Sequence, residues 1–157
     1  MSPSPVELSA FLADETATLA LGENLAMALE PGMFVSLSGE LGSGKTTLAR
    51  GILRGLGYQG KVKSPTYTLV ELYKLSRLDL YHFDFYRFND PQELLDAGFR
   101  DNFGSGNLCL VEWPERATGL LPPADIEIAL AAEGAGRRLR IKAETEPGTH
   151  CLKTLQI

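Results

Sequence analysis

Residues 39–46 read Gly-Glu-Leu-Gly-Ser-Gly-Lys-Thr, a complete phosphate-binding loop with glycine, four free positions and then Gly-Lys-Ser/Thr. The run before it, residues 33–37, is short, apolar and partly β-branched, so it predicts a buried strand. The run after it, residues 46–53, predicts a helix. A strand, a glycine loop and a helix in this order surround an anion with backbone amides and the positive end of a helix dipole. The stretch therefore predicts a nucleotide-binding α/β domain.

Each residue type in this loop has its own task. The glycines carry no Cβ, so the backbone can approach phosphates and adopt positive φ; they are Gly39, Gly42 and Gly44. We expect the Lys45 ammonium to reach the β- and γ-phosphates and the Thr46 hydroxyl to ligate Mg²⁺. A glycine-rich turn with a surface lysine is the plainer alternative, which the flanking patterns disfavour. The loop alone tells neither which nucleotide binds nor whether its phosphate is hydrolysed or transferred.

Size and composition are those of one ordinary globular domain. The chain has 157 residues, of which 44% are hydrophobic and 22% charged, and its net charge is −5. We expect a single domain over residues 1–157, with flexible ends at 1–10 and 145–157. The negative charge argues against a broad nucleic-acid-binding face. The N-terminus does not resemble a secretory signal, no apolar run reaches membrane-spanning length, and two cysteines form no disulfide framework, so a cytoplasmic location is expected.

The rest of the chain alternates helix and strand patterns. A helix is expected to begin at the N-cap Asp14 and to end at Pro31-Gly32. Further patterns predict a hairpin whose strands lie within residues 63–73 and 78–86, a short helix over 90–98, an apolar strand over 108–111, and a C-terminal hairpin of 126–130 and 139–143. Together they predict an α/β fold of the P-loop NTPase class, with a mostly parallel sheet flanked by helices and added antiparallel strands.

Two acidic residues are candidates for the carboxylate that such a site needs near Mg²⁺. Glu112 follows the apolar run 108–111 directly, where a Walker-B residue is expected, although an exposed acid at a strand end is the plainer interpretation. Asp84 lies in the alternating strand, and on pattern alone a functional role and an ordinary one are equally supported. His82 on the same strand is interpreted as a packed or solvent-facing histidine rather than a catalyst.

Three classes of nucleotide protein compete. A GTPase should carry an Asn-Lys-x-Asp segment that reads guanine, and the sequence has none. A small-molecule kinase should show an arginine-rich lid, which is not evident. An ATP-driven assembly subunit needs only a nucleotide core and a surface that responds to the γ-phosphate, and this class fits best. Thr66 lies where a switch loop would contact that phosphate, although a Ser-Pro-Thr turn without a ligand explains it equally well.

Four sequence blocks resemble one family in order and spacing. They are Gly39–Thr47, Ser64-Pro65-Thr66-Tyr67-Thr68-Leu69-Val70, His82-Phe83-Asp84-Phe85-Tyr86-Arg87 and Leu110-Val111-Glu112-Trp113-Pro114-Glu115. Over about residues 14–143 the chain resembles the TsaE family, also called YjeE-like. That family is the bacterial ATPase subunit of the machinery that makes threonylcarbamoyladenosine in tRNA. The phosphate loop is common to many proteins, whereas the His-x-Asp-x-Tyr-Arg and Val-Glu-Trp-Pro blocks are far more specific.

The resemblance implies roles for individual residues. It implies that Thr46 and Glu112 hold Mg²⁺, that Lys45 binds phosphate, and that Asp84 is needed for hydrolysis. It also implies that ATP is contacted by the loop and by three outlying residues, in all Gly39, Gly42, Ser43, Gly44, Lys45, Thr46, Thr47, Thr66, Glu15 and Arg137. The implied partners are TsaB and TsaD, through which the subunit would act on tRNA indirectly.

Overall fold

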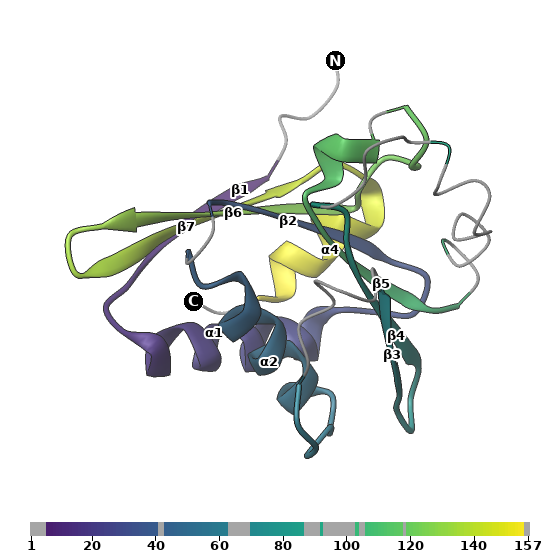
Figure 1. Cartoon of the computed structure of the whole chain (residues 1–157), viewed down its shortest axis with the longest axis horizontal. Coiled ribbons are helices and arrows are strands. Elements are labelled where there is room, and N and C mark those ends of the chain that lie inside the picture. Colours follow the sequence, from purple (N-terminus) through teal and green to yellow (C-terminus); the bar gives the residue numbers. More distant parts are fainter. Residues whose placement is uncertain are drawn as a thin grey trace.

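The computed structural model describes residues 6–40, 43–62, 70–86, 92, 103, 106–117 and 119–155. Its elements are β1 (Glu7–Leu12), α1 (Glu15–Ala28), β2 (Phe34–Ser38), α2 (Lys45–Gly55), β3 (Val70–Lys74), β4 (Asp79–Asp84), β5 (Leu108–Glu112), η2 (Pro114–Ala117), β6 (Ile126–Glu133), β7 (Gly136–Ala143) and α4 (Glu146–Thr154). The strands form one seven-stranded sheet in the order β1-β7-β6-β2-β5-β4-β3 (Figure 1).

The sheet is parallel at its centre and antiparallel at its edges. The pairs β6–β2, β2–β5 and β5–β4 are parallel, and the pairs β1–β7, β7–β6 and β3–β4 are antiparallel. The predicted α/β class with added antiparallel strands is confirmed, as are both predicted hairpins. Parallel pairs make up only half of the pairings, fewer than a mostly parallel sheet would have. Every residue of β5 is buried, as expected of a central parallel strand covered on both faces.

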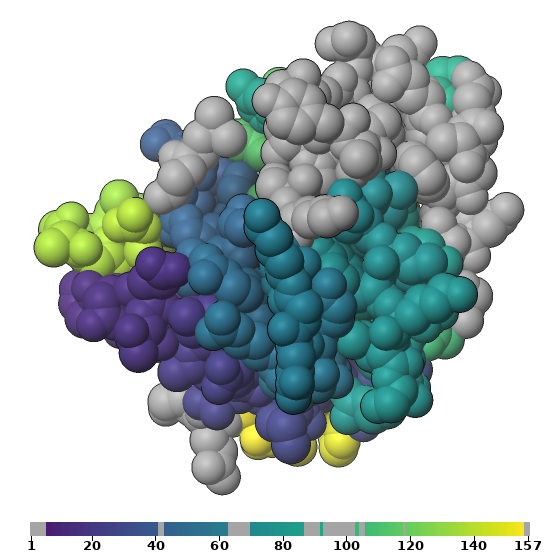
Figure 2. Space-filling view, turned by 60° about the horizontal axis from the view of Figure 1, so that its bottom comes forward, coloured from purple at the N-terminus to yellow at the C-terminus, as the bar shows by residue number. Residues whose placement is uncertain are grey.

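Helices α1 and α2 pack backbone against backbone. Asp14 caps α1 as predicted, its Oδ1 accepting from the Ala17 amide at 2.8 Å. A Cβ on Gly22 would lie 2.7 Å from the Leu48 carbonyl oxygen, and a Cβ on Gly51 would lie 2.5 Å from that of Leu19. Only glycine permits this approach, which sets α2 firmly on α1 (Figure 2). Because α2 begins at the phosphate loop, the contact also fixes the loop.

The two faces of the sheet are covered differently. Helices α1, α2 and α4 all contribute to one apolar cluster, through residues such as Leu25, Ile52 and Leu152. The other face carries a second cluster around Phe34 and Phe83, to which η2 adds its residue Ala117. We expected helices on both sides of the sheet. Among the described residues, the second face carries only the short 3-10 helix η2. The helix predicted over residues 90–98 lies outside the described residues apart from Gln92.

Regular structure also occurs in both ends that the sequence predicted to be flexible. Strand β1 pairs with β7 along its whole length, and α4 packs Cys151 and Leu152 into the core. The sequence signal is weak because β1 is a short edge strand, and because α4 is short and carries Gly148 in its first turn. Tertiary contacts hold α4 instead: Asp125 accepts hydrogen bonds from its cap, Thr145 Oγ1, at 2.6 Å and from the Phe34 amide of β2 at 2.7 Å.

Candidate functional site

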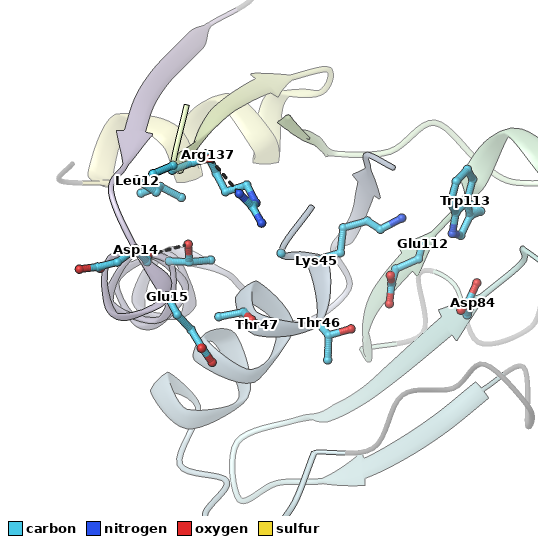
Figure 3. Close-up of a pocket in the computed structure, with 14 residues that line it drawn as sticks. Leu12, Asp14, Glu15, Lys45, Thr46, Thr47, Asp84, Glu112, Trp113 and Arg137 are labelled. Carbon is cyan, nitrogen blue, oxygen red and sulfur yellow. Dashed lines mark hydrogen bonds between the residues drawn. The ribbon is translucent and has the colours of Figure 1, made fainter. Parts of the chain in front are cut away.

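A cavity of about 380 Å³ lies at the carboxyl ends of the central parallel strands. Asp84 is the last residue of β4 and Glu112 the last of β5, and the two lie opposite each other in the pairing register. The loop that follows β2 brings Lys45 to the same edge. Ligands of open α/β sheets bind at this edge, outside the carboxyl ends of the strands. The cavity is lined by Leu12, Asp14, Glu15, Thr18, Gly44, Lys45, Thr46, Thr47, Asp84, Glu112, Trp113, Ala135, Gly136 and Arg137 (Figure 3).

Most of the residues predicted from sequence come together here. The cavity lining includes Glu15, Gly44, Lys45, Thr46, Thr47, Asp84, Glu112 and Arg137. Gly39 and Ser43 lie in the adjoining loop, and Gly42 and Thr66 fall outside the described residues. Sequence reasoning did not predict the other six lining residues as site residues; they are Leu12, Asp14, Thr18, Trp113, Ala135 and Gly136. Apart from Trp113, which follows Glu112, they come from the end of β1, the start of α1 and the β6–β7 turn, where no local motif marks a site.

The loop has the backbone geometry that its glycines predict. Gly39 has φ +147° and Gly44 has φ +104°, conformations that L side chains rarely adopt. A Cβ on Gly39 would also lie 2.6 Å from the Leu130 carbonyl oxygen. Gly44 is the N-cap of α2 and supplies no side-chain cap, so the first amides of the helix are left for a ligand. The buried Ser43 Oγ has no hydrogen-bond partner within the described structure.

Lys45 is held inside the cavity without an ion pair to any residue that the structure describes. Its side chain is only 5% exposed, and Nζ donates to the Gly39 carbonyl oxygen at 2.6 Å. The ammonium also lies 4.0 Å from the centre of the Trp113 ring. Burial lowers the pKa of Lys45, and the nearby carboxylates of Glu112 and Asp84 oppose that shift. The amine is thus a desolvated cation whose partners are a carbonyl and an aromatic face.

Both carboxyl groups are buried close to this amine. Asp84 Oδ1 accepts from the Tyr86 amide at 2.9 Å, and Glu112 Oε2 lies 2.7 Å from His82 Nε2. Burial raises the pKa of Asp84; the Tyr86 hydrogen bond opposes the rise, and the neighbouring Glu112 adds to it. In Figure 3 Lys45, Glu112, Asp84 and Trp113 occupy one end of the cavity. Trp113 reaches this position with φ +57°, a left-handed conformation unusual for an aromatic residue.

The other end of the cavity is more open and is built from different elements. Glu15 at the start of α1 pairs with Arg50 of α2 at 3.1 Å, and both side chains are partly exposed. Arg137 reaches from β7 to the phosphate loop, where its Nε donates to the Ser43 carbonyl oxygen at 3.0 Å. Figure 3 shows Leu12, Glu15 and Arg137 together at this end. Residues from β1, α1 and β7 thus extend the cavity away from the acidic end.

Comparison with known proteins covers this whole arrangement. A family model described as "Threonylcarbamoyl adenosine biosynthesis protein TsaE" matches residues 12–140, which include every residue of the cavity lining. The chain belongs to the TsaE family. The resemblance noted in the four sequence blocks is therefore confirmed.

Relatives and a solved structure agree with this assignment. A tRNA threonylcarbamoyladenosine biosynthesis protein TsaE from Haemophilus influenzae is 43% identical over 150 residues, which are 92% of this chain and 95% of that protein. One from Rickettsia conorii is 40% identical over 129 residues, 82% of this chain and 73% of that protein. The crystal structure of Bacillus subtilis YdiB superposes with a TM-score of 0.80 at 28% identity, covering 98% of this chain and 97% of that one.

The cavity of this TsaE-family chain fits a phosphate-bearing ligand. The first amides of α2, the buried Lys45 ammonium and the Ser43 hydroxyl, which has no partner among the described residues, all suit an anion. The Thr46 hydroxyl and the Glu112 carboxylate supply oxygen atoms that Mg²⁺ prefers. The described residues hold no cluster of three His, Cys, Asp or Glu side chains arranged for a metal. Mg²⁺ in phosphate sites needs no such cage, because substrate oxygens and water complete its shell.

Asp84→Asn is expected to stabilise the ligand-free protein at neutral pH. Because burial raises the pKa of Asp84 in the folded state, the folded protein binds this proton more tightly than the unfolded chain does. Stability is therefore lost as pH rises from about 4, the ordinary range of an aspartate, through the folded pKa. The gain in the free energy of unfolding of Asp84→Asn over wild type should therefore be absent at the acid end of this pH window and complete above it.

Urea unfolding at a series of pH values measures this difference directly. Asp79→Asn, at the other end of β4, is the matched control and should not reproduce the trend. A wild-type protein more stable than Asp84→Asn at neutral pH would contradict the burial argument.

No helix among the described residues has both the length and the apolar character needed to cross a membrane.

Proposed function

We propose that this TsaE-family chain is a Mg²⁺-dependent ATPase that supports threonylcarbamoyladenosine modification of tRNA and acts with TsaB and TsaD. The observation that carries the proposal is the meeting of Lys45, Asp84 and Glu112 at one end of a cavity that opens onto the phosphate loop. The names of the matched relatives support the pathway. The chain's own residues support the chemistry.

The binding step assigns a task to each loop residue. The α2 amides and the Ser43 hydroxyl would bind phosphate oxygens, and Lys45 would leave the Gly39 carbonyl for the β- and γ-phosphates. Thr46 and Glu112 would hold Mg²⁺, which when bound offsets charge that develops on the phosphate oxygens. Glu15 and Arg137 would contact the part of the nucleotide at the open end of the cavity.

The hydrolytic step assigns Asp84 to water. A water oxygen attacks the γ-phosphorus, the bond to the β-phosphate oxygen breaks, and ADP leaves with that electron pair. Asp84 would orient the water and accept its proton. A carboxylate whose pKa is raised by burial is a stronger base than one in bulk water, which suits this task. Trp113 and the surrounding buried strand ends would limit the access of other water.

ATP is expected to bind more tightly than GTP. The sequence carries no Asn-Lys-x-Asp segment, so GTP lacks the side chains that usually read its base. Unlabelled ATP and GTP compete for a fluorescent ATP analogue, and the two inhibition constants are compared. We expect the inhibition constant of ATP to be lower than that of GTP by about 10-fold or more, which corresponds to about 1.4 kcal/mol. Tighter binding of GTP would refute the nucleotide assignment.

The partners should associate in a nucleotide-dependent way. A partner that recognises the ATP-bound form gains affinity from the γ-phosphate, and ATP must then bind more tightly in the complex. The net charge of −5 also fits a subunit that reaches tRNA through other proteins. Purified TsaB, TsaD and this chain are mixed with ATP, with ADP or without nucleotide, and their co-elution is measured. Lys45→Ala is the control.

We expect the complex to be most abundant with ATP. Equal co-elution in all three states would contradict the proposal that nucleotide controls the association. No co-elution in any state would favour a free-standing ATPase or a small-molecule kinase.

A further inference from the structure

A buried imidazole lies directly behind the Glu112 carboxylate. His82 is 0% exposed, and its Nε2 is 2.7 Å from Glu112 Oε2. Within the described part of the chain its other ring nitrogen, Nδ1, has no hydrogen-bond partner. The ring therefore makes one polar contact there, and that contact is to the proposed Mg²⁺ ligand.

The strand register explains how the contact arises. Leu80, His82 and Asp84 alternate onto one face of β4, and His82 pairs with Leu110 on β5. Glu112 lies two residues further along β5 than Leu110, opposite Asp84 and on the same face, so the imidazole reaches diagonally toward the cavity. Leu80 and Leu110 are both buried in the main core. A leucine would suit the surroundings of residue 82, whereas a buried imidazole is costly unless it is hydrogen-bonded.

The hydrogen bond restrains the carboxylate. A carboxylate oxygen accepts and an imidazole N–H donates, so this contact ties one Glu112 oxygen to the ring of a fully buried side chain. Lys45 lies in the same buried space, yet it forms no ion pair with Glu112 and bonds to the Gly39 carbonyl. Without the imidazole hydrogen bond the carboxylate would be free to rotate away from the proposed Mg²⁺ position.

We infer that His82 is a positioning residue, which holds the Glu112 carboxylate toward the metal position. This inference rests on the proposed Mg²⁺–ATP function of the same cavity. It assigns to His82 no contact with the nucleotide and no proton transfer. It also gives a physical reason for a histidine at a strand position where the neighbours are leucines.

The test separates metal binding from nucleotide binding. His82→Leu removes the donor and suits the apolar surroundings, and His82→Gln keeps an N–H donor near the position of Nε2. His150→Leu, at the only other histidine and on the exposed side of α4, is the matched control. Binding of a non-hydrolysable ATP analogue is measured by calorimetry in EDTA and across a Mg²⁺ titration. Circular dichroism checks that each variant is folded.

We expect His82→Leu to bind the analogue in EDTA within about twofold of wild type, because the loop and Lys45 are untouched. The Mg²⁺ concentration for half-maximal effect should rise about 10- to 100-fold, the usual cost of losing the partner of a metal ligand. His82→Gln should recover most of this shift, and it carries the test alone if the leucine variant does not fold. The His150 control should match wild type.

A double-variant cycle shows whether the effect passes through Glu112. In a Glu112→Gln background, His82→Leu should cause little further change in Mg²⁺ dependence. An equal and additive shift in that background would overturn the positioning role, as would an unchanged Mg²⁺ dependence in both His82 variants. Failure of the proposed function would look different, since the wild-type protein itself would then bind no analogue with or without Mg²⁺.

Discussion

Lys45→Ala is expected to lower the affinity for ATP by about 100-fold or more and to remove measurable turnover. Truncating one partner of a buried, charge-assisted contact costs about 2–5 kcal/mol, and about 2.7 kcal/mol corresponds to that factor. The ammonium is already desolvated inside the cavity, so little of its interaction with phosphate would be spent on removing water. Calorimetric titration with a non-hydrolysable analogue measures the affinity.

The same substitution should leave the fold intact. Lys45 makes no ion pair with the described residues, and burial disfavours its charged form in the folded protein, which is why its pKa is lowered. Removing it therefore relieves a cost while losing one carbonyl contact and the Trp113 contact. Lys153→Ala, on an exposed site of α4, is the matched control and should bind ATP as wild type does. Wild-type affinity and turnover in Lys45→Ala would refute the phosphate-loop assignment.

Asp84→Asn and Glu112→Gln are expected to impair the protein in different ways. Asp84→Asn should bind ATP normally but turn it over about 10²- to 10⁴-fold more slowly, the range for losing a general base. Its Asn Oδ1 can still accept from the Tyr86 amide, so the local backbone should hold. Glu112→Gln should instead require more Mg²⁺, because an amide oxygen is a weaker ligand than a carboxylate.

Steady-state and single-turnover phosphate release across a Mg²⁺ titration separates these two effects. Asp79→Asn on the same strand should behave as wild type. Turnover at the wild-type rate in Asp84→Asn would remove its catalytic role. A Glu112→Gln variant with an unchanged Mg²⁺ requirement would remove Glu112 from the metal site, and with it the reason for a histidine at position 82.

The parts of the fold predicted from sequence are those whose chemistry is local. The loop at residues 39–46 follows from its glycines and its flanking elements, and Glu112 from the apolar run of β5 that ends on it. The cap at Asp14 likewise depends on a few neighbouring residues. Each of these signals is complete within about ten residues, a span over which pattern and propensity are informative.

The parts that sequence could not supply depend on topology. Leu12 and Gly136 enter the cavity because β1 and β7 pair at one edge of the sheet, and no short pattern reports that pairing. α4 forms despite Gly148 in its first turn, and Asp125 holds its cap through a hydrogen bond from Thr145. The contact of His82 with Glu112 requires the register of β4 on β5, which places them two residue pairs apart on one face of the sheet. The alternation of His82 with Asp84 was visible in sequence, but the parallel neighbour was not.

The central claim is that the cavity hydrolyses ATP, and the fate of the γ-phosphate tests it most directly. ATP labelled at the γ-position is incubated with Mg²⁺, TsaB, TsaD and the wild-type chain, and the labelled products are separated, with Lys45→Ala as the control. We predict that the label is released as inorganic phosphate by the wild-type chain and stays on ATP with Lys45→Ala. Label transferred to another molecule, or ATP left intact by the wild-type chain, would contradict the account.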